Sequence, residues 1–323
     1  MHYKILGGTG VKVSGLCFGT MSFGGDADAA TARAMFSRCR EVGINFFDCA
    51  DVYAGGRSEE ILGKLVAECR ADVVLCTKFA GSTGADVNAG GASRRHLRSA
   101  VEASLRRLGT DYIDLYFIHH FDSNTPIEQT LRALDDLVRA GKILYPAASN
   151  FAAWQVERAL GLSAAKGWAR FECIQPMYNL AKRQAEVELL PMAQAEQLGV
   201  ITYSPLGAGL LTGKYAPSVR PAGDRLVSSP NYQARYREAA YYDLAERFAE
   251  FARERETEPA ALAVAWVASH PAVTAPIIGA RNLDQLEGSL ASLKVDMTPA
   301  LRAEISALAP EPPLATDRSE DRT

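Results

Sequence analysis

The chain has 323 residues, of which 48% are hydrophobic and 23% are charged, and its formal net charge at pH 7 is −3. This composition is typical of a globular protein with a sizeable core, and without a basic surplus we expect no nucleic acid partner. The length permits two ordinary domains or one large α/β barrel. No apolar segment reaches the roughly 18 residues of a membrane span, and the N-terminus has no export signal, so we expect a cytoplasmic protein without membrane contact.

The first residues predict a β-hairpin that plugs one end of a barrel. "YKIL" (3–6) and "VKVS" (11–14) flank the glycine turn "GGTG" (7–10). The turn resembles half of a dinucleotide fingerprint, but that motif would have to open a helix, and Gly10 is followed by Val11 and Lys12. We therefore interpret it as a turn.

Eight pairs of a β-rich run and a helical pattern follow in chain order. The runs are "LCFGT" (16–20), "INFFD" (44–48), "VVLCTK" (73–78), "IDLYFIHH" (113–120), "ILYPAAS" (143–149), "ECIQP" (172–176), "VITYS" (200–204) and "APIIG" (275–279). The helical patterns cover 29–42, 57–68, 93–109, 126–140, 151–165, 184–198, the residues after an irregular segment at 207–231, and 282–292. Gly109, Gly141 and Gly199 are expected to close three of these helices. Eight pairs favour a parallel (β/α)8 TIM barrel over an open doubly wound sheet.

Residues 1–309 are expected to form this barrel domain, and the proline-rich, charged residues 310–323 a flexible tail. The six cysteines contain no C-x-x-C pair and lie in apolar surroundings. We interpret them as buried thiols rather than disulfides or metal ligands, and we expect no metal.

Nearly every predicted strand delivers a polar or glycine residue at its C-terminal end, where the active site of a parallel α/β barrel lies. These residues are Gly19, Thr20, Met21, Asp48, Tyr53, Lys78, His119, His120, Ser149, Asn150, Gln175, Tyr203, Ser204, Gly279 and Arg281.

Alternation along the strand favours one of the two adjacent histidines. Side chains two residues apart share a face, so His119 lies with the apolar residues 113, 115 and 117, whereas His120 lies with Asp114. An apolar face suits the barrel interior, which points His119 toward the site. A histidine with a purely structural hydrogen bond remains the alternative.

Asp48, Tyr53, Lys78 and His119 arrive at consecutive strand ends and have complementary chemistry. Tyrosine is a weak acid at neutral pH because its ordinary pKa is near 10. A lysine ammonium beside it lowers that pKa, and an aspartate fixes the lysine. An imidazole can then orient a carbonyl oxygen. We interpret the four residues as a proton-donating site for carbonyl reduction, with the hydride supplied from elsewhere.

An ordered set of motifs extends this interpretation. It comprises "FGTMSFGG" (18–25), "INFFDCADVYAGGRSEEILG" (44–63), "LCTKF" (75–79), "LGTDYIDLYFIHH" (108–120), "GKILYPAASNF" (141–151), "IQPMYNL" (174–180), "YSPLGAGLLTGKY" (203–215) and "PIIGARNLDQL" (276–286). From about residue 3 to residue 292 the chain thereby resembles the aldo-keto reductase superfamily, most closely bacterial members related to potassium-channel β subunits and general-stress reductases. The resemblance implies that Tyr53 is the proton donor, that Asp48 is the partner of Lys78, and that His119 orients the substrate.

The resemblance also implies NADP(H) bound across the top of the barrel without a Rossmann domain. Tyr203 would stack on the nicotinamide ring, with a core aromatic as the alternative, and Lys214 would serve the pyrophosphate. Arg281 would meet a 2′-phosphate, which favours NADPH over NADH; Arg225 would add a phosphate contact or lie on the surface. The implied cofactor residues are Gly19, Thr20, Met21, Asp48, Ser149, Asn150, Gln175, Tyr203, Ser204, Pro205, Leu206, Gly207, Gly209, Lys214, Arg225, Gly279, Arg281, Gln285 and Ser289.

Two departures from the family pattern bear on these expectations. Gly288 and Ser289 stand near positions where many relatives carry Glu-Asn against the adenine, so we expect lower cofactor affinity. Pro146 lies in "YPAASNF" where "GVSNF" is common, and its missing N–H suggests a local irregularity of the strand.

The leading hypothesis is therefore NADPH-dependent reduction of an aldehyde or ketone, with a small carbonyl or alcohol compound as the partner. The same site run in reverse as an alcohol or sugar dehydrogenase, an NADP(H)-sensing regulatory protein and a phosphate-binding isomerase are the alternatives. Candidate pocket walls, whose aromatic residues suggest an apolar or ring-shaped ligand, are Ser22, Phe23, Tyr53, Phe79, His120, Phe121 and the segment 206–236.

Overall fold

Eight parallel strands close into a barrel, as predicted. The computed structural model describes residues 1–216, 218–219, 221, 224–316, 318 and 320. The strands are β3 (Cys17–Gly19), β4 (Phe46–Asp48), β5 (Val74–Phe79), β6 (Ile113–Ile118), β7 (Ile143–Ser149), β8 (Cys173–Gln175), β9 (Gly199–Thr202) and β10 (Ala275–Ile278). They follow one another in chain order around the barrel, and β10 closes it against β3. The fold is thus the (β/α)8 barrel expected from the alternation of strands and helices.

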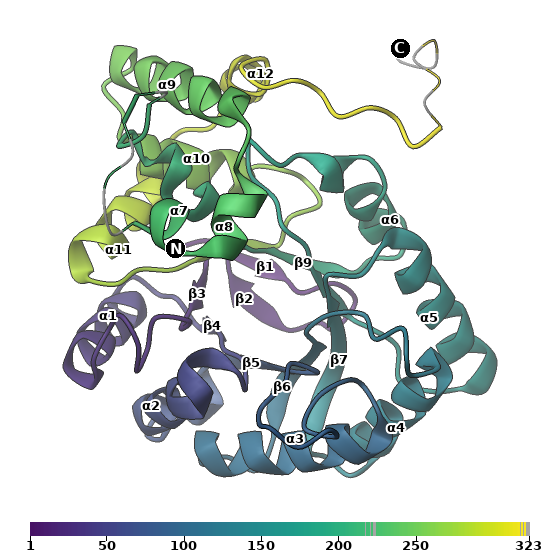
Figure 1. Cartoon of the computed structure of the whole chain (residues 1–323). Coiled ribbons are helices and arrows are strands. Elements are labelled where there is room, and N and C mark those ends of the chain that lie inside the picture. Colours follow the sequence, from purple (N-terminus) through teal and green to yellow (C-terminus); the bar gives the residue numbers. More distant parts are fainter. Residues whose placement is uncertain (217, 220, 222–223, 317, 319, 321–323) are drawn as a thin grey trace.

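Helices surround the strands in a ring (Figure 1). They are α1 (Ala29–Glu41), α2 (Arg57–Val66), α3 (Arg94–Leu108), α4 (Ile127–Arg139), α5 (Ala153–Lys166), α6 (Leu189–Ala195), α7 (Arg225–Ser228), α8 (Pro230–Arg235), α9 (Ala239–Glu254), α10 (Pro259–Ala268), α11 (Leu283–Leu290) and α12 (Pro299–Ser306). Short 3₁₀ turns are η1 (Tyr53–Gly56), η2 (Arg70–Asp72), η3 (Gln184–Glu186), η4 (Gly207–Thr212) and η5 (Ala291–Lys294). Among the residues that the structure describes, no helix combines the length and apolar character needed to cross a membrane.

The predicted N-terminal hairpin closes one end of the barrel. Strands β1 (Tyr3–Ile5) and β2 (Lys12–Ser14) pair antiparallel, and the buried Leu6 and Val13 join the apolar side chains inside the barrel. Gly7 has a left-handed φ of 52°, and a Cβ there would lie 2.6 Å from the amide nitrogen of Gly199, the first residue of β9. The hairpin therefore lies at the N-terminal ends of the strands and leaves the opposite end open.

Two apolar layers follow from the alternation along each strand. In β6, Leu115 and Phe117 lie inside the barrel, whereas Tyr116 and Ile118 pack against the helices, as alternation predicted. Ile113, at the start of the strand, was expected inside but belongs to the outer cluster. The interior cluster also includes Cys17, Cys76 and Cys173. All six cysteines are free thiols; five are buried and Cys69 is half-buried.

Three local expectations were wrong. The segment 184–198 contains η3 and a separate helix, α6, because Pro191 has no N–H to continue a helix from η3. Gly199 does not close that helix but begins β9, where a Cβ would lie 2.5 Å from Leu6 Cδ1. The segment predicted to be irregular, 207–231, contains η4, α7 and the start of α8.

The predicted irregularity at Pro146 is also absent, since β7 runs unbroken from Ile143 to Ser149. The Pro146 carbonyl accepts a hydrogen bond from the Glu172 amide (3.0 Å) and so faces β8. Because the nitrogen and the carbonyl of one strand residue point to the same side, the Pro146 nitrogen faces β8 as well. Pairing with β8 begins only at Ala147, so the ladder loses no donor at this point. The tail predicted at 310–323 falls partly on residues 317, 319 and 321–323, which lie outside the described residues.

Two helical glycines are expected to respond oppositely to alanine. A Cβ at Gly63 in α2 would lie 2.4 Å from the Leu108 carbonyl oxygen, whereas nothing lies within 4 Å of one at the exposed Gly161 in α5. Gly63→Ala should lower the free energy of unfolding by about 1–3 kcal/mol through overpacking. Gly161→Ala should raise it by roughly 0.5–1 kcal/mol through helix propensity. Urea unfolding followed by circular dichroism measures both, and equal shifts would contradict the close contact of α2 with α3.

Candidate active site

A cleft of about 680 Å³ opens at the C-terminal ends of the barrel strands. This volume lies within the roughly 300–1,000 Å³ of ordinary ligand sites. One end contains Tyr53, His119 and Tyr203, which we call the catalytic end for the role expected of these residues, and its other end contains Lys214 and Arg281. The cleft is therefore long enough for one ligand to contact residues from many of the loops that follow the strands.

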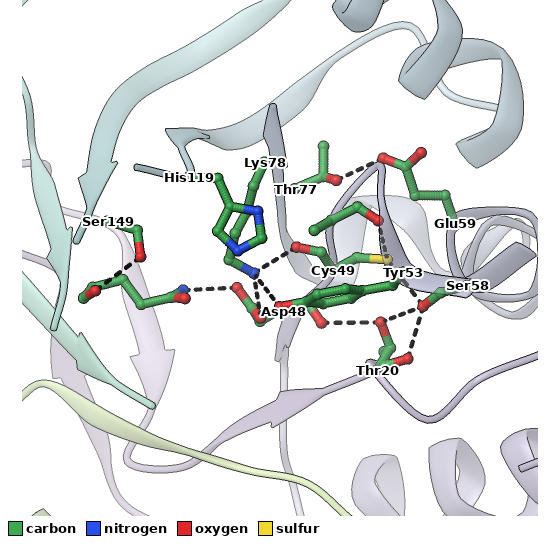
Figure 2. A network of polar contacts seen from close by, with 12 residues as sticks. Thr20, Asp48, Cys49, Tyr53, Ser58, Glu59, Thr77, Lys78, His119 and Ser149 are labelled. Atoms are coloured by element: carbon green, nitrogen blue, oxygen red, sulfur yellow. Dashed lines mark hydrogen bonds and ion pairs between the residues drawn. The ribbon is translucent and has the colours of Figure 1, made fainter. Parts of the chain in front are cut away.

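The fully buried Lys78 ammonium is the centre of the polar network beneath the cleft (Figure 2). Its Nζ donates to Asp48 Oδ2 (2.6 Å), to the Cys49 carbonyl (2.7 Å) and to the Tyr53 hydroxyl (3.2 Å). The other Asp48 oxygen accepts from Gln175 Nε2 at 2.8 Å. Three acceptors satisfy the three N–H groups, so the charge is buried but paired.

The pKa values of Lys78 and Tyr53 are both raised, but for different reasons. Burial alone would lower the pKa of Lys78, but the charge of Asp48 and the contact with Tyr53 outweigh it and raise the pKa. Burial raises the pKa of Tyr53 to about 12, and Lys78 offsets only part of that rise. The expectation that the lysine lowers the tyrosine pKa below its ordinary value was therefore wrong, because desolvation of the phenolate is the larger effect.

His119 is a neutral imidazole at the cleft. Burial, followed by the charge of Lys78, lowers its pKa to about 3. Its Nδ1 is buried and has no hydrogen-bond partner among the described residues, which leaves Nε2 as the nitrogen open to the cleft. Its ring lies edge-on to Tyr53 with centroids 6.1 Å apart. His120 is exposed and does not line the cleft.

Asn150 ties together the loops that follow three strands. Its Nδ2 donates to the His119 carbonyl (2.8 Å), and its Oδ1 accepts from the Tyr203 hydroxyl (2.7 Å). Asn150, Ser204 and Ala208 all have left-handed φ values, between 56° and 59°. Such backbone conformations are costly for residues other than glycine and tend to occur at functional sites. The rim of the cleft is thus held in a specific, strained conformation.

A second group of hydroxyls and a thiol supports Asp48 from behind. Thr20 Oγ1 donates to the Asp48 carbonyl (3.0 Å) and lies 2.9 Å from Ser58 Oγ. Ser58 in turn donates to the Thr20 carbonyl (2.7 Å) and contacts Cys49 Sγ. Thr20 is fully buried and therefore supports the site without lining the cleft.

Asp51 is a buried carboxyl without a hydrogen-bond partner for either oxygen among the described residues. Its neighbour Glu59 is satisfied by Thr77 and Arg107, each at 2.6 Å. Burial, and then the charge of Glu59, raises the pKa of Asp51 to about 7. Asp51 is therefore close to its titration point at neutral pH.

The other end of the cleft holds a cluster of cations around one carboxylate. Asp224 lies 2.9 Å from Lys214 Nζ and 3.2 Å from Arg281 Nη2. The 3₁₀ turn η4, just before Lys214, contains Gly209, whose φ is 95° and where a Cβ would lie 3.3 Å from Lys214 Cε. A small residue is required at this point, and the two cations converge on a single anionic group.

Most residues implied by the resemblance line the cleft. These are Gly19, Met21, Asp48, Ser149, Asn150, Gln175, Tyr203, Ser204, Pro205, Leu206, Gly209, Lys214, Arg225, Gly279, Arg281 and Gln285. Thr20, Gly207 and Ser289 do not. A Cβ at Gly207 would face the Tyr236 hydroxyl at 3.5 Å, and the Ser289 hydroxyl is buried without a partner among the described residues.

Some of these residues contact one another, where the resemblance implied contacts with the cofactor. Ser149 Oγ donates to the Gln175 carbonyl (2.9 Å), so these two residues are already joined. Gln285 Oε1 accepts from the Arg281 amide (3.0 Å). Arg225 faces Asp26 at 3.6 Å while still lining the cleft.

Of the predicted pocket walls, Ser22 and Tyr53 line the cleft. Phe23 and Phe79 are fully buried between strands and helices, and His120 and Phe121 lie outside the cleft. Sequence reasoning did not single out Asp224, Tyr232 and Arg235, although they lie within the segment 206–236. For Tyr232 and Arg235 the signal was the helical start at Pro230, which brings α8 to the cleft, whereas Asp224 lies just before α7.

Comparison with known proteins gives one family. Residues 15–309 match the model described as "Aldo/keto reductase family". The chain is 36% identical over 324 residues to "Uncharacterized oxidoreductase YrpG" of Bacillus subtilis, with 97% of each chain covered. It is 37% identical over 310 residues to "Probable voltage-gated potassium channel subunit beta" of Arabidopsis thaliana, with 93% of each covered. It is 34% identical over 328 residues to "Versiconal hemiacetal acetate reductase" of Aspergillus parasiticus, covering 93% and 94%.

The raised pKa of Asp51 predicts that the effect of Asp51→Asn on stability depends on pH. Because the folded pKa is raised, the carboxyl favours folding at low pH and opposes it as the pH rises through about 7. Between about pH 5 and pH 8 the stability of Asp51→Asn should therefore rise relative to wild type, by on the order of 2 kcal/mol. Thermal unfolding across this range measures the difference. Asp111→Asn, at an exposed site, is the control, and a pH-independent difference would contradict the buried, unpartnered carboxyl.

Proposed function

Because the chain belongs to the aldo/keto reductase family and is thus an oxidoreductase acting on carbonyl groups, we propose that it reduces an aldehyde or ketone to the alcohol with NADPH as its cofactor. The observation that carries this proposal is the buried Lys78 ammonium, which contacts both Asp48 and the Tyr53 hydroxyl directly beneath the cleft. The nicotinamide ring supplies the hydride when the cofactor is bound.

Tyr53 acts as the proton donor in this proposal. Its buried hydroxyl holds the proton firmly on its own, since its pKa is about 12. Lys78, 3.2 Å away, stabilises the phenolate that forms as the proton moves to the carbonyl oxygen. Asp48 keeps Lys78 charged throughout. In the reverse direction the same phenolate accepts a proton from an alcohol, so the residues serve either direction.

His119 orients the carbonyl. Because it stays neutral and its Nδ1 has no partner among the described residues, the tautomer with hydrogen on Nε2 presents a donor to the cleft. A neutral donor polarises the carbonyl oxygen without competing with Tyr53 for the proton. The two roles agree with the pKa values of the two residues, which are about 12 for Tyr53 and about 3 for His119.

The far end of the cleft fits a ligand that carries phosphates. Asp224 serves as a stand-in anion, since Lys214 and Arg281 converge on its carboxylate. Lys214 and the backbone around Gly209 would hold the pyrophosphate, and Arg281 a 2′-phosphate. Ser149, Asn150 and Gln175 would hold the nicotinamide amide, beside Tyr203. Lys214 and Arg281 would then exchange Asp224 for a nucleotide phosphate as their partner.

A second candidate is a protein that binds the same cofactor to regulate a partner rather than for turnover; the Arabidopsis relative is named as a probable channel subunit. A sensing protein would bind NADPH tightly and reduce none of a panel of generic aldehydes. The intact contact of Lys78 with both Asp48 and Tyr53 favours turnover.

Tyr53→Phe tests the proton donor. Loss of the hydroxyl should lower kcat for 4-nitrobenzaldehyde by about 10²- to 10⁴-fold, because no other described group at Lys78 can donate the proton. The dissociation constant for NADPH, measured by protein fluorescence, should stay within about twofold of wild type. Tyr3→Phe, at the opposite end of the barrel, is the control. Undiminished turnover in Tyr53→Phe would sink the mechanism.

Arg281→Ala tests the choice of cofactor. Only NADPH has a 2′-phosphate, so the variant should weaken NADPH binding by about tenfold and leave NADH binding nearly unchanged. Fluorescence titration with each nucleotide measures the effect, with Arg255→Ala, directly after α9, as a control outside the cleft. Equal weakening for both nucleotides would mean that Arg281 contacts a part of the cofactor that NADPH and NADH have in common.

A further inference from the structure

The catalytic end of the cleft carries an arginine that, within the described part of the chain, faces aromatic rings. Arg235, the last residue of α8, lines the cleft and is partly buried. Its guanidinium carbon lies 5.2 Å from the ring centroid of Tyr232 and 5.9 Å from that of Tyr203. Among the described residues no carboxylate forms an ion pair with it. Aromatic faces attract a cation but do not neutralise its charge.

The end of α8 that carries Arg235 is anchored. The next residue, Tyr236, is fully buried, and its hydroxyl accepts from Asn179 Nδ2 at 3.1 Å. Asn179 Nδ2 also contacts the Ser204 carbonyl (2.9 Å), in the loop that carries Tyr203. The position of Arg235 over Tyr203 is thus fixed by buried contacts rather than by a loop at the surface.

The other cations that line the cleft have carboxylate partners. Lys214 and Arg281 share Asp224, and Arg225 faces Asp26. Arg235 therefore provides a positive charge that the described part of the chain leaves without an anion. This charge lies on the catalytic side, because Tyr203 is linked through Asn150 to the His119 carbonyl.

We infer that Arg235 recognises a carboxylate on the substrate, so that the preferred substrates are aldehydes or ketones that carry a carboxylate group. The guanidinium offers paired N–H donors that match a carboxylate, and partial burial strengthens the contact. The inference rests on the proposed function and gives it a substrate class. Tyr203 and Tyr232 would form apolar walls on either side of the anion.

The test compares 4-formylbenzoate with its uncharged methyl ester. In Arg235→Gln, the ratio of kcat/KM for the acid to kcat/KM for the ester should fall by about tenfold to a hundredfold, mainly through KM for the acid. Arg235→Lys should retain part of the preference, because the charge remains. Arg237→Gln, which removes an exposed arginine two residues away, should leave the ratio unchanged.

A binding measurement provides a readout that does not depend on turnover. Isothermal titration calorimetry of the protein with NADP⁺ present should show 4-methylbenzoate, which has no alcohol to oxidise, binding more tightly than 4-methylbenzamide. Arg235→Gln should abolish that difference. An unchanged difference would overturn the inference even if the variant were catalytically impaired.

The outcomes separate the two proposals. If the wild-type protein reduces neither aldehyde, the proposed function fails, and the calorimetry still decides whether Arg235 binds carboxylates. If both aldehydes are reduced and Arg235→Gln leaves their ratio unchanged, the inference fails and the proposed function stands. If Arg235→Gln weakens NADPH binding with the ratio unchanged, Arg235 contacts the cofactor phosphates, which also overturns the inference.

Discussion

The contact of Lys78 with Asp48 is the constraint on which the rest of the site depends. A fully buried ammonium is tolerated only with a nearby counter-charge and saturated hydrogen bonds, and Asp48, the Cys49 carbonyl and Tyr53 supply them. Neighbouring parallel strands, β4 and β5, deliver the two charges to the same end of the barrel. Gln175 reaches Asp48 from β8, which is not a neighbour of β4, so the network spans the mouth of the barrel.

The ion pair of Lys78 with Asp48 also influences the protonation states of Tyr53 and His119. The raised pKa of Lys78 keeps a positive charge beside Tyr53, and that charge helps to hold His119 neutral. A protonated phenol and a neutral imidazole thus lie side by side at one end of the cleft. Burial creates both states, since it disfavours a charged phenolate and a charged imidazolium alike.

Charged side chains lie at both ends of the cleft. Asp224 gathers Lys214 and Arg281 at the far end, whereas Arg235 stands over Tyr203 at the catalytic end. In the two proposals made above, each end would receive a different anionic group, the far end a nucleotide phosphate and the other end a substrate carboxylate. The aromatic residues of 206–236 had instead suggested a simple apolar pocket.

The amino-acid sequence by itself determined the eight strands, most helix ends, the hairpin and the candidates Asp48, Tyr53, Lys78 and His119. Periodicity, caps and strand-end position are local properties, so they can be read along the chain. Only the tertiary structure decided the separation of α6 from η3, the helical content of 207–231, and the positions of Asp224 and Arg235. It also reversed the expected pKa shift of Tyr53. Desolvation and ion pairing depend on neighbours that are distant in sequence, and no local pattern reports them.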